Sequence, residues 1–90
     1  MRLLSCQPNP FAGTTAIHYE LPATLAISLG IYDVAGRLVQ TLVAGDRAPG
    51  RHVVRWDRTA SDGAHVSSGV YFVQLKTTAG ESVQRVVVID

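Results

Sequence analysis

The sequence contains a single cysteine, and this scarcity excludes several kinds of site. Cys6 has no second cysteine in the chain with which to form a disulfide, and it can offer a metal only one thiolate. Long apolar runs are also lacking, since none approaches the roughly 18 residues of a membrane-spanning helix. We therefore expect no internal disulfide, no thiolate metal centre and no membrane insertion.

An excess of charge of one sign is missing as well. Eight basic and seven acidic residues give a net charge of +1, and they are scattered along the chain. A protein that binds nucleic acid needs a basic face to neutralise phosphates. The sequence therefore predicts no nucleic-acid partner.

The chain also lacks a catalytic motif. Its three histidines, His18, His52 and His65, stand outside any recognisable catalytic pattern, and no Gly-x-Ser-x-Gly elbow is present. His52 alternates in phase with Trp56, which favours a histidine at the edge of the core over a metal ligand. We expect a protein that is not an enzyme and that carries no cofactor.

One loop contains oxygen-rich side chains. Asp57 and Asp62 lie there with Thr59 and Ser61, but their spacing is not that of an EF-hand, and carboxylates at such positions also cap turns. We expect no metal site, and a weak calcium site at Asp57 and Asp62 remains the alternative.

What the chain does have is alternation of apolar and polar residues, most clearly over residues 68–77. Tyr71, Val73 and Leu75 fall on one face of this segment, directly behind Gly69. β-Branched and aromatic residues with a period of two indicate a strand. We expect it to be a central strand whose apolar face fills the core.

The same alternation predicts strands at 14–21, 25–34, 37–43, 51–57 and 81–89, separated by turn residues. Residues 44–50 and 59–68 are predicted as loops, and residues 1–11 as an apolar run followed by a kinked entry segment with two prolines. No window has a helical period. The 90 residues, 47% of them hydrophobic, predict one all-β domain over residues 1–90, an immunoglobulin-like antiparallel β-sandwich of six to seven strands. Trp56 and Tyr71 are expected to pack between the sheets.

The last predicted strand has two different faces. Val86 and Val88 lie on the face expected to be buried, and Arg85 and Val87 lie on the other. Pairing with the preceding strand leaves the opposite edge of this strand exposed. We expect that edge to be available for strand addition by a partner.

Five segments, taken in order, resemble the C-terminal sorting domain of the type IX secretion system. They are Pro8-Asn9-Pro10-Phe11, Thr14 to Pro22, Ile31 to Val39 with the turn Asp33-Val34-Ala35-Gly36, Gly50 to Asp57 with Trp56, and Ser68-Gly69-Val70-Tyr71-Phe72. The middle segments are equally similar to the immunoglobulin-like domain of the flagellar hook-capping protein. The resemblance covers nearly the whole chain.

The resemblance to the sorting domain implies a function in secretion. It implies that the domain is the C-terminal piece of a larger secreted protein, that the translocon binds it in the periplasm, and that it accompanies an N-terminal cargo domain across the outer membrane. A sortase at the cell surface then removes it, and the cargo is attached or released. The residues that match the family's recognition strand are Arg85, Val86, Val87, Val88 and Ile89, and the terminal Asp90 departs from the usual ending.

Two alternatives remain open. One is a structural immunoglobulin-like module of the hook-capping type. The other is a carbohydrate-binding module of a secreted glycosidase, for which Tyr32 and Phe72 are the candidates for an exposed aromatic platform.

Overall fold

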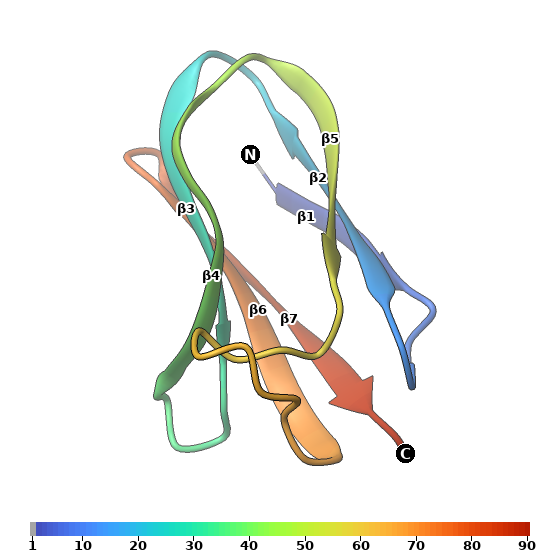
Figure 1. The fold of residues 1–90 in the computed structure, drawn as a ribbon. Helices are drawn as coiled ribbons and strands as arrows, with labels where there is room; N and C mark the ends of the chain where they lie inside the picture. The colour runs from blue at the N-terminus through green and yellow to red at the C-terminus, as the bar shows by residue number, and fades with distance from the viewer. Residues whose placement is uncertain (1) are drawn as a thin grey trace.

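The computed structural model describes residues 2–90 and consists of strands and connecting loops (Figure 1). The strands are β1 (Arg2–Gln7), β2 (Thr15–Leu21), β3 (Leu25–Tyr32), β4 (Leu38–Arg47), β5 (Gly50–Trp56), β6 (Gly69–Thr77) and β7 (Gly80–Val88). Among the described residues no helix is long and apolar enough to cross a membrane. The predicted all-β immunoglobulin-like sandwich is confirmed, with seven strands.

The strands form two antiparallel sheets that pack face to face. One sheet has the order β1-β2-β5 and the other has the order β4-β3-β6-β7. The chain changes sheet after β2, after β4 and after β5, so each sheet contains segments distant in sequence. In the larger sheet β4 and β7 are the two edge strands.

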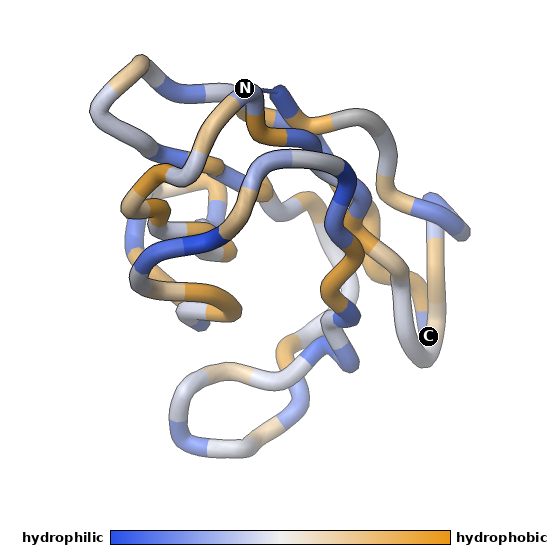
Figure 2. Tube along the Cα trace, turned by 90° about the horizontal axis from the view of Figure 1, so that it is seen from above, coloured by the Kyte–Doolittle hydropathy of each residue, from blue (hydrophilic) through white to orange (hydrophobic). Residues whose placement is uncertain are grey.

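Alternation along the strands builds the core between the sheets, and Figure 2 shows hydrophobic and hydrophilic residues alternating along the trace. Trp56 is fully buried, and its ring contacts Tyr71 edge to face at a centroid distance of 5.6 Å, as predicted. Phe11 contacts the Trp56 ring in the same way, also at 5.6 Å, and is only 2% exposed. The core position of Phe11 was not predicted.

Two of the expected boundaries were wrong. Residues 44–50 were predicted as a loop because of their glycines, Asp46 and Pro49, but β4 continues to Arg47, and only Ala48 and Pro49 separate it from β5. β3 supplies a hydrogen-bonding partner along this whole stretch, up to the pair Leu25 and Arg47. Pairing with a neighbouring strand therefore overrides the local turn composition.

The second difference concerns the beginning of the chain. The apolar run before Pro8 was expected only as an entry segment, but residues 2–7 form β1, which pairs with β2. The register shifts between Leu3 and Ser5, so the alternation is interrupted. This interruption removes the period of two by which a strand is recognised in a sequence.

Candidate functional site

The last strand, which carries the predicted recognition residues up to Val88, pairs regularly with its neighbour. β7 pairs with β6 over nine consecutive positions without a register shift. Val86 and Val88 are 0% and 1% exposed, and Arg85 is exposed on the opposite face. The predicted division of the strand into a buried and an exposed face is confirmed.

The outer edge of β7, facing away from β6, is covered over residues 85–89 by the segment from Asn9 to Phe11. The Asn9 side-chain amide donates to the Arg85 carbonyl at 3.0 Å, and its oxygen accepts from the Val87 N–H at 3.0 Å. The Phe11 N–H donates to the Val87 carbonyl at 3.0 Å, and the Ile89 N–H donates to the Phe11 carbonyl at 2.9 Å. We call this set of four hydrogen bonds the clasp. The expectation of a free edge was therefore wrong for residues 85–89.

Arg58 ties the clasp to the loop that precedes β6. Its guanidinium donates to the carbonyls of Ala12 at 3.2 Å and Val66 at 2.8 Å. It also reaches the Ile89 carbonyl at 3.4 Å and forms an ion pair with Asp90 at 3.1 Å. This role was not predicted, because an isolated arginine in a loop carries no local signal for it.

The exposed face of β7 continues across the sheet as a mainly apolar patch, with Gln74 and Lys76 also in its lining. Tyr32, Phe72 and Arg85 are register partners on β3, β6 and β7 and lie in one row. Tyr32 and Phe72 are half-buried and line a shallow depression of about 370 Å³ together with Val83, which is 54% exposed. The structure thus brings together the two aromatic residues singled out from the sequence and places them beside β7, the predicted recognition strand.

The turn between β3 and β4 is held by one carboxylate. Asp33 accepts the backbone N–H groups of Ala35 at 2.9 Å and Arg37 at 3.0 Å, and it pairs with the Arg37 guanidinium at 3.0 Å. The Arg37 N–H is the main reason why the pKa of Asp33 lies below its ordinary value. Gly36 supplies the positive φ of 82° that the turn requires. These residues stabilise a hairpin turn.

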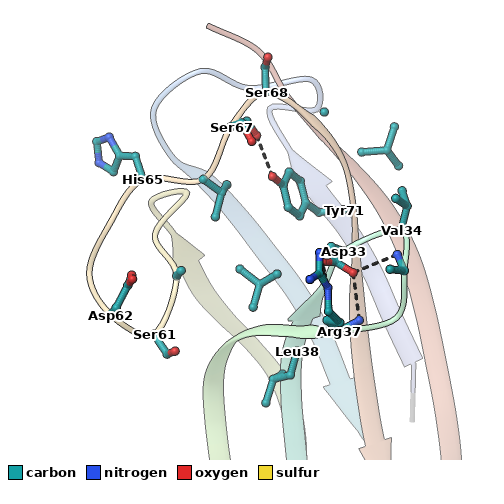
Figure 3. A pocket seen from close by; sticks show the side chains of 16 residues that line it. Asp33, Val34, Arg37, Leu38, Ser61, Asp62, His65, Ser67, Ser68 and Tyr71 are labelled. Carbon is teal, nitrogen blue, oxygen red and sulfur yellow. Dashed lines mark hydrogen bonds and ion pairs between the residues drawn. The ribbon is translucent and has the colours of Figure 1, made fainter.

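This turn and residues 60–71 line an open pocket of about 690 Å³ (Figure 3). The Tyr71 hydroxyl donates to the Ser67 carbonyl at 2.7 Å and fixes the segment that leads into Gly69, where φ is 150°. The hydrogen bonds drawn in Figure 3 join residues close to one another in sequence, so they stabilise the backbone of the turns that line the pocket. The named motif positions Asp33, Gly36, Gly69 and Tyr71 therefore act in local structure.

The candidate calcium ligands each belong to a turn of their own. Asp57 accepts from the Thr59 hydroxyl, which lowers the pKa of this carboxyl, and Asp62 accepts from the Ala64 N–H at 2.9 Å. No group of three or more His, Cys, Asp or Glu residues arranged for a metal ion occurs within residues 2–90.

Two other side chains considered for chemistry, Cys6 and His52, are held within the fold. Burial raises the pKa of the Cys6 thiol to about 11, so the thiol stays protonated at neutral pH. His52 stacks on Tyr19 at a centroid distance of 5.1 Å, and its Nε2 lies 2.8 Å from the Ala48 carbonyl. This is the predicted position at the edge of the core.

The sequence profile of the FlgD Ig-like domain family matches residues 7–81. The chain belongs to this family. The match includes the clasp residues Asn9 and Phe11 and ends within β7. No curated protein sequence matches the chain significantly.

Two solved structures are similar to this FlgD Ig-like domain. PorZ of Porphyromonas gingivalis, an essential bacterial surface component of the type IX secretion system, is 27% identical with a TM-score of 0.67; the alignment covers 96% of this chain and 11% of PorZ. Dimeric latent PorU of the same organism is 19% identical with a TM-score of 0.70, covering 97% of this chain and 9% of PorU. The PorU likeness shows the fold alone, and the chain spans only a small part of either protein.

Proposed function

We propose that this Ig-like domain is a sorting domain of the type IX secretion system, without catalytic activity of its own. The observation that supports this most is the 27% identity to part of PorZ across 96% of the chain, because PorZ is a surface component of that system. In this proposal the domain follows an N-terminal cargo domain. The translocon binds it in the periplasm, it crosses the outer membrane with the cargo, and a cell-surface sortase removes it.

In this proposal the translocon contacts the exposed face of the last strand. Val86 and Val88 are buried, so they hold the strand in place and are not themselves accessible. Arg85 and Val83 are exposed on the outer face, next to the row formed by Tyr32 and Phe72. An apolar patch with a charge at its rim is the usual composition of a protein-binding surface. We assign recognition to this face of β7.

The test is a fusion of residues 1–90 behind a periplasmic reporter, expressed in a host with a type IX apparatus. We expect the reporter in the medium or on the cell surface, and its retention in the periplasm when Val86 to Asp90 are deleted. Because this deletion removes buried side chains, a second variant is needed that leaves the core intact. Arg85→Glu changes an exposed side chain, and Arg55→Glu, exposed on β5 of the other sheet, is its matched control.

Arg85→Glu is expected to reduce export, whereas Arg55→Glu is not. Retention of the intact fusion in the periplasm in a folded state would contradict the proposal. Equal export of the truncated fusion would do the same. Folding of each fusion is checked by the emission of the buried Trp56 in the purified domain.

A structural immunoglobulin-like module is the second candidate, and the match to the FlgD Ig-like domain family favours it. Such a module packs on a neighbouring domain and does not direct export. The same fusion separates the two functions, since a structural module leaves the reporter in the periplasm whichever residue of β7 is changed.

A further inference from the structure

The Asn9 side chain takes the place of a backbone residue at the edge of β7. Each alternate residue of a strand added parallel to this edge would donate to the outward carbonyl of one β7 residue and accept from the outward N–H of the residue two positions further on. The Asn9 carboxamide does both, by accepting from the Val87 N–H and donating to the Arg85 carbonyl. The Asn9 side chain thus provides partners for two backbone groups at the edge of β7, although no strand lies there.

The two halves of the clasp differ in how they are anchored. Phe11 is buried against Trp56 and pairs in parallel with Val88, so its backbone is fixed by the core. Asn9 and Pro10 are exposed, and Asn9 holds its position through a side chain. The Asn9 carboxamide can therefore leave the edge while Phe11 stays in place.

The rest of the edge lies beyond the clasp. In a regular antiparallel pair the outward N–H and C=O groups belong to alternate residues, here Glu81, Val83, Arg85 and Val87. β1 approaches β7 through side chains, because the Leu3 N–H donates to the Ser82 hydroxyl at 3.2 Å and the Cys6 thiol to the Gln84 side chain at 3.5 Å. These contacts use residues of the inner face and leave the backbone edge unpaired with β1.

We propose that the edge of β7 from Glu81 to Val87 is a strand-docking site and that Asn9 occupies its C-terminal end until a partner strand displaces the carboxamide. This deepens the proposed function by naming the kind of partner, an extended segment that adds parallel to β7, in the direction in which Phe11 already pairs with this edge. The outer face of β7 presents Glu81, Val83 and Arg85 in succession. Opposite-charge and apolar cross-strand pairs stabilise a sheet. The partner strand therefore carries an acidic residue opposite Arg85, an apolar one opposite Val83 and a basic one opposite Glu81.

The probe is the synthetic peptide Lys-Thr-Val-Thr-Glu-Thr, which has this pattern when it runs parallel to β7 and ends opposite Val86, where Asn9 now binds. The matched control peptide exchanges Glu and Lys, so that like charges face each other at Arg85 and Glu81. Binding is measured by NMR titration of the isotope-labelled domain. The amides of Val83 and Val87 are the reporters.

We expect the peptide to bind Asn9→Ala about tenfold more tightly than the unaltered domain, because two hydrogen bonds no longer compete with it. Asn9→Asp keeps the acceptor for Val87 and loses the donor to Arg85, so its affinity should lie between the two. The control peptide should bind all three proteins more weakly. In Asn9→Ala the Val87 amide should exchange with solvent faster, whereas the Ile89 amide, bonded to the Phe11 carbonyl, should not.

Equal affinity of the three proteins would overturn the proposal, as would amide shifts centred on β4 or β1. If Asn9→Ala does not fold, the comparison of Asn9→Asp with the unaltered domain gives the same decision. These measurements need only the isolated domain. A domain that binds the peptide but is not exported contradicts the proposed function alone, and a domain that is exported without binding it contradicts this inference alone.

Discussion

The two edge strands of the four-stranded sheet are covered in different ways. At β4 the ladder is irregular, with register shifts between Leu29 and Gly30 and between Ile31 and Tyr32 of β3, and the cover is light. The Ser61 N–H donates to the Val39 carbonyl at 2.9 Å, and the Gln40 side chain reaches the Ala60 carbonyl at 3.1 Å. At β7 the ladder has no shift, and four hydrogen bonds from the clasp cover its end.

The difference shows two solutions to the same problem. An edge with an irregular ladder is a poor template for another strand, so β4 needs little cover. An edge with a regular ladder is a good template, and β7 keeps this regularity beneath Asn9. We interpret the regularity of β7 as a property that the proposed strand docking requires, and the following predictions test the contrast from its largest effect to its smallest.

Removal of the anchor of the clasp should have the largest effect. Phe11→Ala deletes a fully enclosed ring that contacts Trp56 and should lower the free energy of unfolding by about 3–5 kcal/mol. Chemical denaturation followed by Trp56 fluorescence measures it. Phe11→Leu restores much of the apolar volume and should cost clearly less, so equal losses in both variants would show that Phe11 does not act through packing.

Arg58 should come next. Its side chain is 14% exposed and donates to backbone carbonyls on three segments, so Arg58→Ala should cost about 2–3 kcal/mol. The ion pair with Asp90 adds little to this, because that carboxylate is 78% exposed. Asp90→Asn should therefore be almost neutral.

The backbone of Arg58 offers a control for this prediction. Its φ is 57°, a conformation that favours glycine. Arg58→Gly should be less destabilising than Arg58→Ala by about 1 kcal/mol. The reverse order would indicate that the loop relaxes once the guanidinium is lost.

The two edges are compared directly by Asn9→Ala and Gln40→Ala. Asn9 loses two hydrogen bonds to the backbone of β7, so we expect about 1–2 kcal/mol of destabilisation. Gln40 loses one hydrogen bond of good length to another segment, at the Ala60 carbonyl, and one from the exposed N–H of the adjacent Thr41, which water can replace, so the expected cost is about 1 kcal/mol or less. Thermal unfolding of the pair under identical conditions decides the order, and a larger loss for Gln40→Ala would invert our interpretation of the edges.

The smallest expected effect is on the pH dependence of stability in acid. The pKa of Asp33 is lowered in the folded state, so its contribution is present above the ordinary value of 3.8 and is lost as the pH falls below it, through the folded pKa. Asp33→Asn should remove this part of the pH dependence, with a small loss of stability at neutral pH that disappears in acid, where Asp33 itself is protonated. An NMR titration should place the Asp33 midpoint below 3.8, and a midpoint above this value would contradict the role of the turn.

The sequence predicts those parts of the molecule that alternate regularly. The faces of β2, β6 and β7, the Trp56–Tyr71 contact and the buried pair Val86 and Val88 follow from a period of two. The strand β1 was not predicted, because its register shift interrupts the alternation. The end of β4 was not predicted, because its pairing with β3 stabilises an extended backbone despite the local turn residues.

The candidate site was predicted only in part. Asn9 and Phe11 were recognised as motif residues, but their position on β7 was not. The hydrogen bonds of Asn9 join residues 76 and 78 positions apart, and no local pattern encodes such a contact. The role of Arg58 is equally hard to predict from the sequence, since its partners come from three separate segments.

The sequence separation of the clasp also determines when it can close. Residues 9–11 are made before their partners at 85–89, so every chain passes through a stage in which the first part of this domain exists and its closing strand does not. Bringing such distant segments together costs more loop entropy than forming the hairpins β3–β4 and β6–β7. The hairpins should therefore form first and the clasp last. A factor that meets the chain in that interval encounters β7 with its outer edge still open.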